Sequence, residues 1–277
     1  MTQQKMSPKR LPTYFISHGG GPWPYMPALR RALHQLEVSL VDIVRQIGGA
    51  PKAVLVISGH WEERSFTVSS GERPGMIYDY SGFPPETYDV VYPAPGSPAL
   101  AQRVVELAAE RGIQVASDAQ RGFDHGTFTP LAVMFPAADV PIVQVSLKQG
   151  YDPAEHWALG EALAPLRDEG VLILGSGLSY HNLRQFGPGA AAPSASFDAW
   201  LQNTLVGGEI AARRQSMMHW DQAPAARQAH PREDHLVPLM AALGAAQQER
   251  GVTVYHEDNL FGGVTASSFR FGNPVIA

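Results

Sequence analysis

The stretch AVLVISGHW, residues 53–61, decides how this chain folds. Its apolar run VLVI is rich in β-branched side chains, and such a run is typical of a strand buried on both faces of a parallel sheet. The pattern predicts a strand over residues 53–58 that stops at Gly59, where glycine frees the backbone. His60 would then stand at the carboxyl edge of the sheet, where open α/β folds bind their ligands.

Two other segments repeat this pattern of an apolar strand followed by a histidine. The sequence YFISHG, residues 14–19, places His18 directly after a strand predicted over residues 11–17. A strand predicted over residues 171–174 runs into Gly175-Ser176-Gly177, and His181 follows. Three buried strands that each deliver a histidine predict a metal site, because neutral imidazole is a common ligand of iron, zinc and copper.

The rest of the chain alternates between strand-like and helix-like patterns. Helices are predicted over residues 26–47, 97–111, 153–168, 196–220 and 236–250, further strands over residues 65–69, 141–147, 252–255 and 261–271, and a flexible surface loop over residues 187–195. This alternation predicts a single-domain α/β fold with a largely parallel, or mixed, central sheet flanked by helices.

Length and composition limit the classes of function. The 277 residues are 44% hydrophobic and 17% charged, so the chain can bury a substantial core. A net charge of −5 gives no electrostatic reason to expect nucleic acid or an anionic membrane as a partner. The sequence contains no cysteine, which excludes disulfides, a thiolate metal site and a cysteine nucleophile.

The N-terminal region carries no targeting signal that we recognise. Residues 1–10 are polar and predict a disordered lead, and residues 11–277 predict one catalytic domain. The N-terminus lacks the apolar run of a secretory signal, and no stretch approaches the roughly 18 apolar residues of a membrane span. We therefore expect a cytoplasmic protein.

His235 stands out because it opens a predicted helix. The neighbouring Glu233 and Asp234 are explained by the helix dipole alone, which favours negative charge at a helix N-terminus. A charged histidine is disfavoured there, whereas a neutral imidazole bound to a metal is not. It is one of four histidines, with His18, His60 and His181, that lie at the ends of predicted elements. Three protein ligands beside an open position are the arrangement that metal catalysis needs.

Aromatic residues near these histidines have two explanations. The rings of Trp23, Tyr25, Phe123 and Phe128 could wall a flat substrate pocket, but ordinary core packing explains them equally well. The aromatic loop at residues 77–93 could likewise roof a pocket for a planar substrate or be a packed surface loop.

Six motifs together resemble the class III extradiol ring-cleavage dioxygenases, and within them the DOPA 4,5-dioxygenase-like branch is most similar. The motifs, in chain order, are SHGGGP around His18, SGHW around His60, YPAPGSPAL at residues 92–100, FDHGTFTPL around His125, SGLSYHNLR around His181 and EDHLVPL around His235. They span residues 11 to about 244, nearly the whole chain.

This resemblance implies an enzyme that opens the ring of a catechol-type aromatic, DOPA-like or related, with O₂ to give a semialdehyde. The implied partners are therefore a small aromatic diol and O₂. It also implies a non-haem metal held by His18, His60 and His235, with Fe(II) for activity and Zn(II) as an alternative occupant. His235 stands where the wider superfamily has a glutamate, so a carboxylate ligand from Glu233 or Asp234 stays open.

The resemblance also implies roles for two more histidines. His181 matches a residue that acts as an acid–base group in some members and contacts the metal in others. His125 matches a histidine that meets the substrate. One of these imidazoles would accept a proton from the catechol and return it later, as a group that titrates near neutral pH can.

Two other functions stay open at this point. A zinc hydrolase on the same histidines would need a base to activate water, and Glu62 or Asp124 could serve. A metal-free binding module of the same fold is the second alternative. The presence of all five histidines argues against it, because a binder has no chemical need for them.

Overall fold

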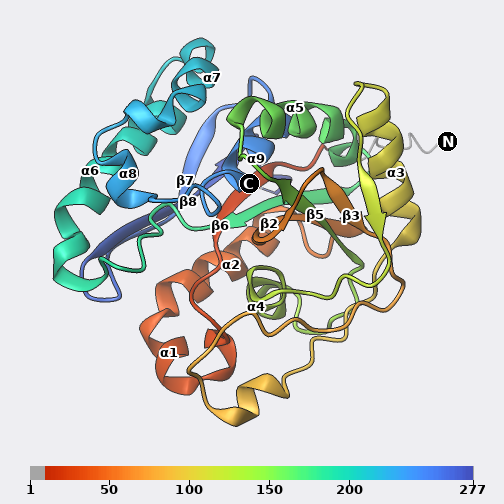
Figure 1. The fold of residues 1–277 in the computed structure, drawn as a ribbon, viewed down its shortest axis with the longest axis horizontal. Coiled ribbons are helices and arrows are strands. Elements are labelled where there is room, and N and C mark those ends of the chain that lie inside the picture. Colours follow the sequence, from red (N-terminus) through yellow and green to blue (C-terminus); the bar gives the residue numbers. More distant parts are fainter. Residues whose placement is uncertain (1–9, 277) are drawn as a thin grey trace, which may run out of the picture.

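An eight-stranded mixed sheet forms the centre of the molecule (Figure 1). The computed structural model describes residues 10–276, so all but the last residue of the predicted disordered lead lie outside it. The strand order is β4-β3-β5-β2-β6-β1-β8-β7. The strands are β1 (Thr13–Ser17), β2 (Ala53–Glu63), β3 (Thr67–Ser69), β4 (Ala116–Asp118), β5 (Ile142–Lys148), β6 (Val171–Gly177), β7 (Gly251–Leu260) and β8 (Val264–Phe271).

The middle of this sheet is parallel, as predicted. Strands β5, β2, β6 and β1 are parallel neighbours, so β1, β2 and β6 end side by side at one edge. The outer pairings β1–β8, β7–β8 and β3–β5 are antiparallel, whereas β3–β4 is parallel. The predicted α/β fold with a largely parallel, or mixed, sheet is confirmed.

Helices cover both faces of the sheet (Figure 1). Alternate residues of β2 point to opposite sides: Leu55 and Ile57 pack with α3, α5 and part of α9, and Val54 and Val56 pack with α2 and α4. The helices are α1 (Pro27–Ala32), α2 (His34–Gln46), α3 (Pro98–Ala109), α4 (His125–Met134), α5 (Pro153–Leu163), α6 (Ala191–Gln202), α7 (Ile210–Met218), α8 (Ala226–Ala229) and α9 (Pro238–Ala246). Short helical turns occupy Trp23–Tyr25, Pro85–Tyr88, Ala164–Arg167, Gly187–Ala190, Asn203–Gly207 and Trp220–Gln222.

One helix prediction and one loop prediction were wrong in their bounds. The helix predicted over residues 26–47 is two helices, α1 and α2, because the backbone leaves helical geometry at Leu33. The loop predicted over residues 187–195 is instead a short turn followed by the first residues of α6. Alanine at residues 191 and 192 favours a helix, and proline at residue 193 is tolerated in its first turn.

Among residues 10–276, the structure has no helix that combines the length and the apolar character needed to cross a bilayer.

His156 on α5 is a fully buried packing residue. Its Nε2 accepts a hydrogen bond from the Lys148 backbone N–H at 3.1 Å, and its Nδ1 donates to the Asp152 carbonyl at 2.8 Å. Burial lowers the pKa of His156 from 6.5 to about 4.

This pKa predicts a loss of stability in acid. Between pH 6.5 and about pH 4 the unfolded chain binds a proton at His156 that the folded chain does not. The free energy of unfolding therefore falls as the pH falls through this range. At about pH 5 the loss is on the order of 2 kcal/mol relative to neutral pH. The free energy of unfolding, measured with urea at about pH 5 and at neutral pH, should differ less in His156→Gln than in the parent protein. Glutamine keeps an acceptor for the Lys148 backbone N–H. Equal pH dependence in both proteins would contradict the assignment.

Candidate metal centre

Three imidazoles converge at the edge where β1 and β2 end. His18 follows β1 directly, His60 lies in β2, and His235 lies three residues before α9. Their ring centroids are 4.9 Å (His18–His60), 5.2 Å (His18–His235) and 4.6 Å (His60–His235) apart. One nitrogen from each ring lies within 4.8 Å of the others, so the three residues could hold a metal ion.

The hydrogen bonds of these rings orient their nitrogens. Nδ1 of His18 donates to the Gly19 carbonyl at 2.8 Å, and Nδ1 of His60 lies 3.0 Å from a carboxylate oxygen of Asp79. Nδ1 of His235 lies 3.3 Å from Asp234, at ion-pair distance but without the alignment of a full hydrogen bond. Because Nδ1 of His18 and of His60 each has an oxygen acceptor, a proton on Nδ1 leaves Nε2 of both rings with a lone pair.

The Nε2 atoms of His60 and His235 face each other. Nε2 of His60 and Nε2 of His235 are 3.0 Å apart, and Nε2 of His18 is buried with no hydrogen-bond partner among the described residues. Lone pairs at that separation repel unless a proton or a cation lies between them. The orphaned His18 nitrogen and the facing pair therefore fit a divalent metal ion, for which neutral imidazole nitrogen is a preferred ligand.

Burial keeps two of the three rings neutral. It lowers the pKa of His18 and of His235 well below 6.5, and the neighbouring imidazoles lower it further. Burial would also lower the pKa of His60, but the hydrogen bond to Asp79 and the charges of Asp79 and Asp124 raise it overall. Protons and a metal ion therefore compete mainly for His60.

Asp79 is a central residue of the site, and we did not identify it from the sequence. One carboxylate oxygen accepts from Nδ1 of His125 at 2.7 Å and from its backbone N–H at 3.1 Å, and the other faces His60. Burial would raise the pKa of Asp79, but these two histidines hold it well below its usual range. The only signal in the sequence was the aromatic loop itself, which places Asp79 between Tyr78 and Tyr80.

The predicted end of the strand at Gly59 was wrong. Strand β2 continues through Gly59 and His60, and its register with β5 shifts before pairing resumes at Glu62. A Cβ on Gly59 would lie 3.0 Å from the Asp234 carbonyl oxygen and 3.3 Å from Cγ of His235. The glycine is needed because the chain carrying His235 crosses β2 at close range.

The strand predicted over residues 171–174 is longer in the structure, because β6 extends to Gly177. A Cβ on Gly177 would lie 2.1 Å from the His235 carbonyl oxygen. Glycines in two adjacent strands thus make room for the same segment.

The start of α4 fixes His125 beside His60. Asp124 is fully buried and caps this helix, accepting from the Thr127 backbone N–H at 3.1 Å. The same carboxylate accepts from Ser58 at 2.8 Å and from Arg121 at 2.6 Å. The His125 ring lies 3.9 Å from that of His60, and burial lowers its pKa despite the hydrogen bond to Asp79.

His181 lies on the other side of His235. The two rings are stacked, with centroids 3.3 Å apart and planes 13° apart, and the His181 backbone N–H donates to the Ala229 carbonyl. Burial, with neighbouring imidazoles, lowers its pKa to about 3. His181 groups with Asp234 and His235 rather than with His18 and His60, so its role as a ligand stays a prediction.

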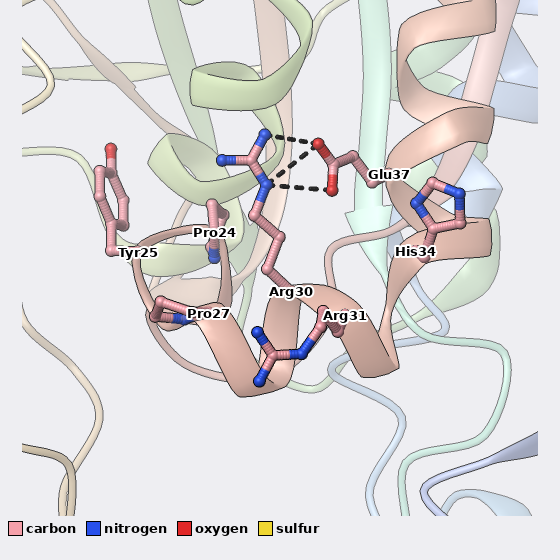
Figure 2. Close-up of a pocket in the computed structure, with 7 residues that line it drawn as sticks. All are labelled: Pro24, Tyr25, Pro27, Arg30, Arg31, His34 and Glu37. Atoms are coloured by element: carbon pink, nitrogen blue, oxygen red, sulfur yellow. Dashed lines mark hydrogen bonds and ion pairs between the residues drawn. The ribbon is translucent and has the colours of Figure 1, made fainter.

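The four aromatic residues predicted at the substrate site occupy different surroundings. Trp23, Phe123 and Phe128 are fully buried, and the Trp23 indole donates to the His18 carbonyl at 2.8 Å. Tyr25 is 38% exposed and lines a cavity of about 680 Å³ over α1 and α2, shown in Figure 2. Arg30 in this cavity pairs with Glu37, and none of the five candidate histidines lines it. The substrate-binding role of these rings stays a prediction.

The bases considered for a zinc hydrolase are already engaged. Glu62 contacts the hydroxyl of Tyr151 and the guanidinium of Arg232. Asp124 is buried in the network with Arg121 and Ser58. Neither carboxylate is free to activate a water molecule.

Comparison with known proteins places this site in a family. Residues 14–272 match the family described as the catalytic LigB subunit of aromatic ring-opening dioxygenase. A 4,5-DOPA dioxygenase extradiol of Beta vulgaris is 38% identical, over 94% of this chain and 96% of its own. The 4,5-DOPA dioxygenase extradiol of Escherichia coli K12 is 34% identical, over 96% of this chain and 97% of its own. A crystal structure of an uncharacterized Escherichia coli K12 protein superposes with a TM-score of 0.72 at 31% identity, covering 95% of this chain and all of that one. The predicted kinship is confirmed, and the chain belongs to the LigB family of class III extradiol dioxygenases.

Proposed function

We propose that this protein is a non-haem, Fe(II)-dependent dioxygenase that opens the ring of a catechol-type aromatic beside its diol. The observation that carries the proposal is the pair of imidazole nitrogens of His60 and His235 held 3.0 Å apart, with the unpartnered nitrogen of His18 beside them. The relatives named 4,5-DOPA dioxygenase support a DOPA-like or related catechol as substrate. The predicted cytoplasmic location suits this cofactor, because a reducing compartment preserves Fe(II).

His18, His60 and His235 would hold the metal. Three neutral nitrogens leave part of the coordination sphere free for small ligands, and Zn(II) would also fit them. Bound there, Fe(II) would supply Lewis acidity toward the catechol oxygens and redox chemistry with O₂. Both atoms of O₂ enter the product, one in the new carboxylate and one in the new aldehyde.

His125 would act as the base. Its Nδ1–H is held by Asp79, so its Nε2 carries the lone pair that accepts a proton from the catechol. Because burial lowers its pKa, the ring is neutral and ready at pH 7. Once protonated, the imidazolium is stabilised by Asp79 and can return the proton later. His181 is the second candidate for this proton transfer, from the opposite side of His235.

The substrate ring would lie near the aromatic side chains beside these histidines. Trp23, Phe123 and Phe128 shape this region from within the core, and Tyr25 is the partly exposed member of the predicted set. The ring of Tyr80, next to Asp79, lies 5.8 Å from that of His125 and belongs with them. The aromatic loop would thus contribute both a carboxylate and a ring.

One experiment tests the function. The protein is loaded with Fe(II) without air, mixed with a catechol and then exposed to oxygen, while O₂ uptake and a coloured ring-fission product are followed. We expect iron-dependent O₂ uptake with one O₂ consumed per catechol. No uptake across a broad catechol panel, together with ester or amide hydrolysis by the zinc form, would support the hydrolase instead. Failure to retain any metal would support a binding module.

A further inference from the structure

A small cavity adjoins the far side of His181. Its volume is about 290 Å³, and it is lined by His181, Asn182, Leu183, Arg184, Pro231, Arg232 and Asp234. His181 and Asp234 also belong to the histidine cluster, so the cavity shares a wall with the site described above. The ring of His181, which lines this cavity, stacks on that of His235, with centroids 3.3 Å apart.

The charged groups of this cavity are unequally compensated. The guanidinium of Arg232 contacts the Glu62 carboxylate and lies 5.0 Å over the ring of Tyr151. Asp234 accepts from the His235 backbone N–H at 3.1 Å and faces that ring as well. Arg184 is exposed, and within residues 10–276 its side chain has neither an ion pair nor a hydrogen bond. Arg184 is therefore the cation of this cavity that has no ion-pair partner among the described residues. The Asp234 carboxylate lies 4.0 Å from Nδ1 of His181 and 3.3 Å from Nδ1 of His235.

The backbone that carries Arg184 is firmly held. Asn182 is buried; its Oδ1 accepts from the Arg184 backbone N–H at 3.1 Å, and its Nδ2 donates to the Gln228 carbonyl at 2.8 Å. The preceding His181 N–H donates to Ala229, so two hydrogen bonds tie this turn to the segment that leads to His235. Arg184 is thus presented from a fixed backbone, which lowers the entropic cost of using it for binding.

We infer that Arg184 is a specificity-determining residue that binds a carboxylate on the side chain of the catechol. This inference rests on the proposed function, because it assumes that the diol lies at the histidine cluster. The cavity and the histidine cluster share His181 and Asp234, so a substituent of the bound ring that reaches past His181 would meet Arg184. The planar guanidinium then meets the carboxylate with two N–H donors, the geometry in which arginine binds such groups best. A cationic substituent would be repelled.

The test uses three catechols that differ in the charge of the substituent. These are dihydroxyphenylpropionate, which is anionic, ethylcatechol, which is neutral, and dopamine, which is cationic, each assayed with the Fe(II)-loaded protein. We expect the propionate to have the lowest KM. Arg184→Gln should raise that KM about tenfold, the effect of one lost charge-assisted hydrogen bond. The same variant should leave kcat, and the KM for ethylcatechol, within about twofold of the unsubstituted protein.

The matched control is Arg31→Gln, because Arg31 is an exposed arginine on α1 in the separate cavity of Figure 2. It should change none of these values. Calorimetry without oxygen should show a tenfold higher Kd for the propionate in Arg184→Gln, independently of turnover. Equal effects of Arg184→Gln on propionate and ethylcatechol, or a preference for dopamine, would overturn the inference. If no catechol consumes O₂, the proposed function fails, and calorimetry still decides the role of Arg184.

Discussion

Replacing His60 with alanine is expected to abolish metal retention and ring cleavage together. The substitution removes one of three converging nitrogens and leaves Nε2 of His235 without the partner that faces it at 3.0 Å. We expect metal affinity to fall by more than about 100-fold, because even groups that only support metal ligands are worth 10- to 100-fold. Metal content per protein after dialysis, measured by mass spectrometry for the iron and zinc forms, provides the check.

His125→Gln is the matched comparison for that variant. His125 is buried and its ring is 3.9 Å from that of His60, but its nitrogens are not part of the cluster formed by His18, His60 and His235. Glutamine cannot take up a proton near pH 7, so kcat should fall by about 100-fold or more while metal content stays normal. If both variants lose metal to the same extent, the division between ligand and base is wrong.

Asp79→Asn is expected to damage metal binding and turnover at once. The carboxylate accepts from both His60 and His125, whereas an amide offers one acceptor and one donor, so one imidazole must change its tautomer. The lost charge also lowers the proton affinity of both rings. We expect metal affinity to fall about 10- to 100-fold and kcat by at least a similar factor. Zn(II) competition against a chromophoric chelator measures the first effect, and O₂ uptake at saturating iron measures the second.

Asp89→Asn is the control for that experiment. Asp89 is an exposed carboxylate in the same aromatic loop, ten residues along the chain, and its side chain makes no contact with the histidine cluster. Both metal affinity and kcat should be unchanged in this variant. A loss of turnover in Asp79→Asn with unaltered zinc affinity would show that Asp79 supports only His125.

The sequence was sufficient to predict that His18 and His60 lie close together. Each follows or interrupts an apolar strand, and parallel strands bring their carboxyl ends to one edge of the sheet. His181 follows a strand of the same set, but it lies beside His235 instead. His235 was found for a different reason, because a charged ring is unfavourable at a helix start. The fold class rested on the same alternation of buried strands and helices.

Asp79 could not be predicted in this way. It lies in a loop with no regular period, and its partner His125 is 46 residues away, so no local pattern records their contact. The strand was wrongly predicted to end at Gly59. In a sequence, a glycine that ends a strand cannot be distinguished from one that makes room for a crossing chain. The break at Leu33 was missed because the helical spacing of leucines continues across it in the sequence, although the backbone leaves helical geometry there.

The single carboxylate shared by His60 and His125 couples the two rings thermodynamically. A positive charge on His60 lowers the proton affinity of His125. By reciprocity, a proton on His125 lowers the affinity of His60 for a proton or a metal ion. Asp79 reduces this antagonism because it compensates whichever ring is charged. A metal ion bound by His60 would therefore lower the pKa of His125 further than burial already does. Metal binding at His60 and the protonation state of His125 are thus linked through Asp79, a single loop residue.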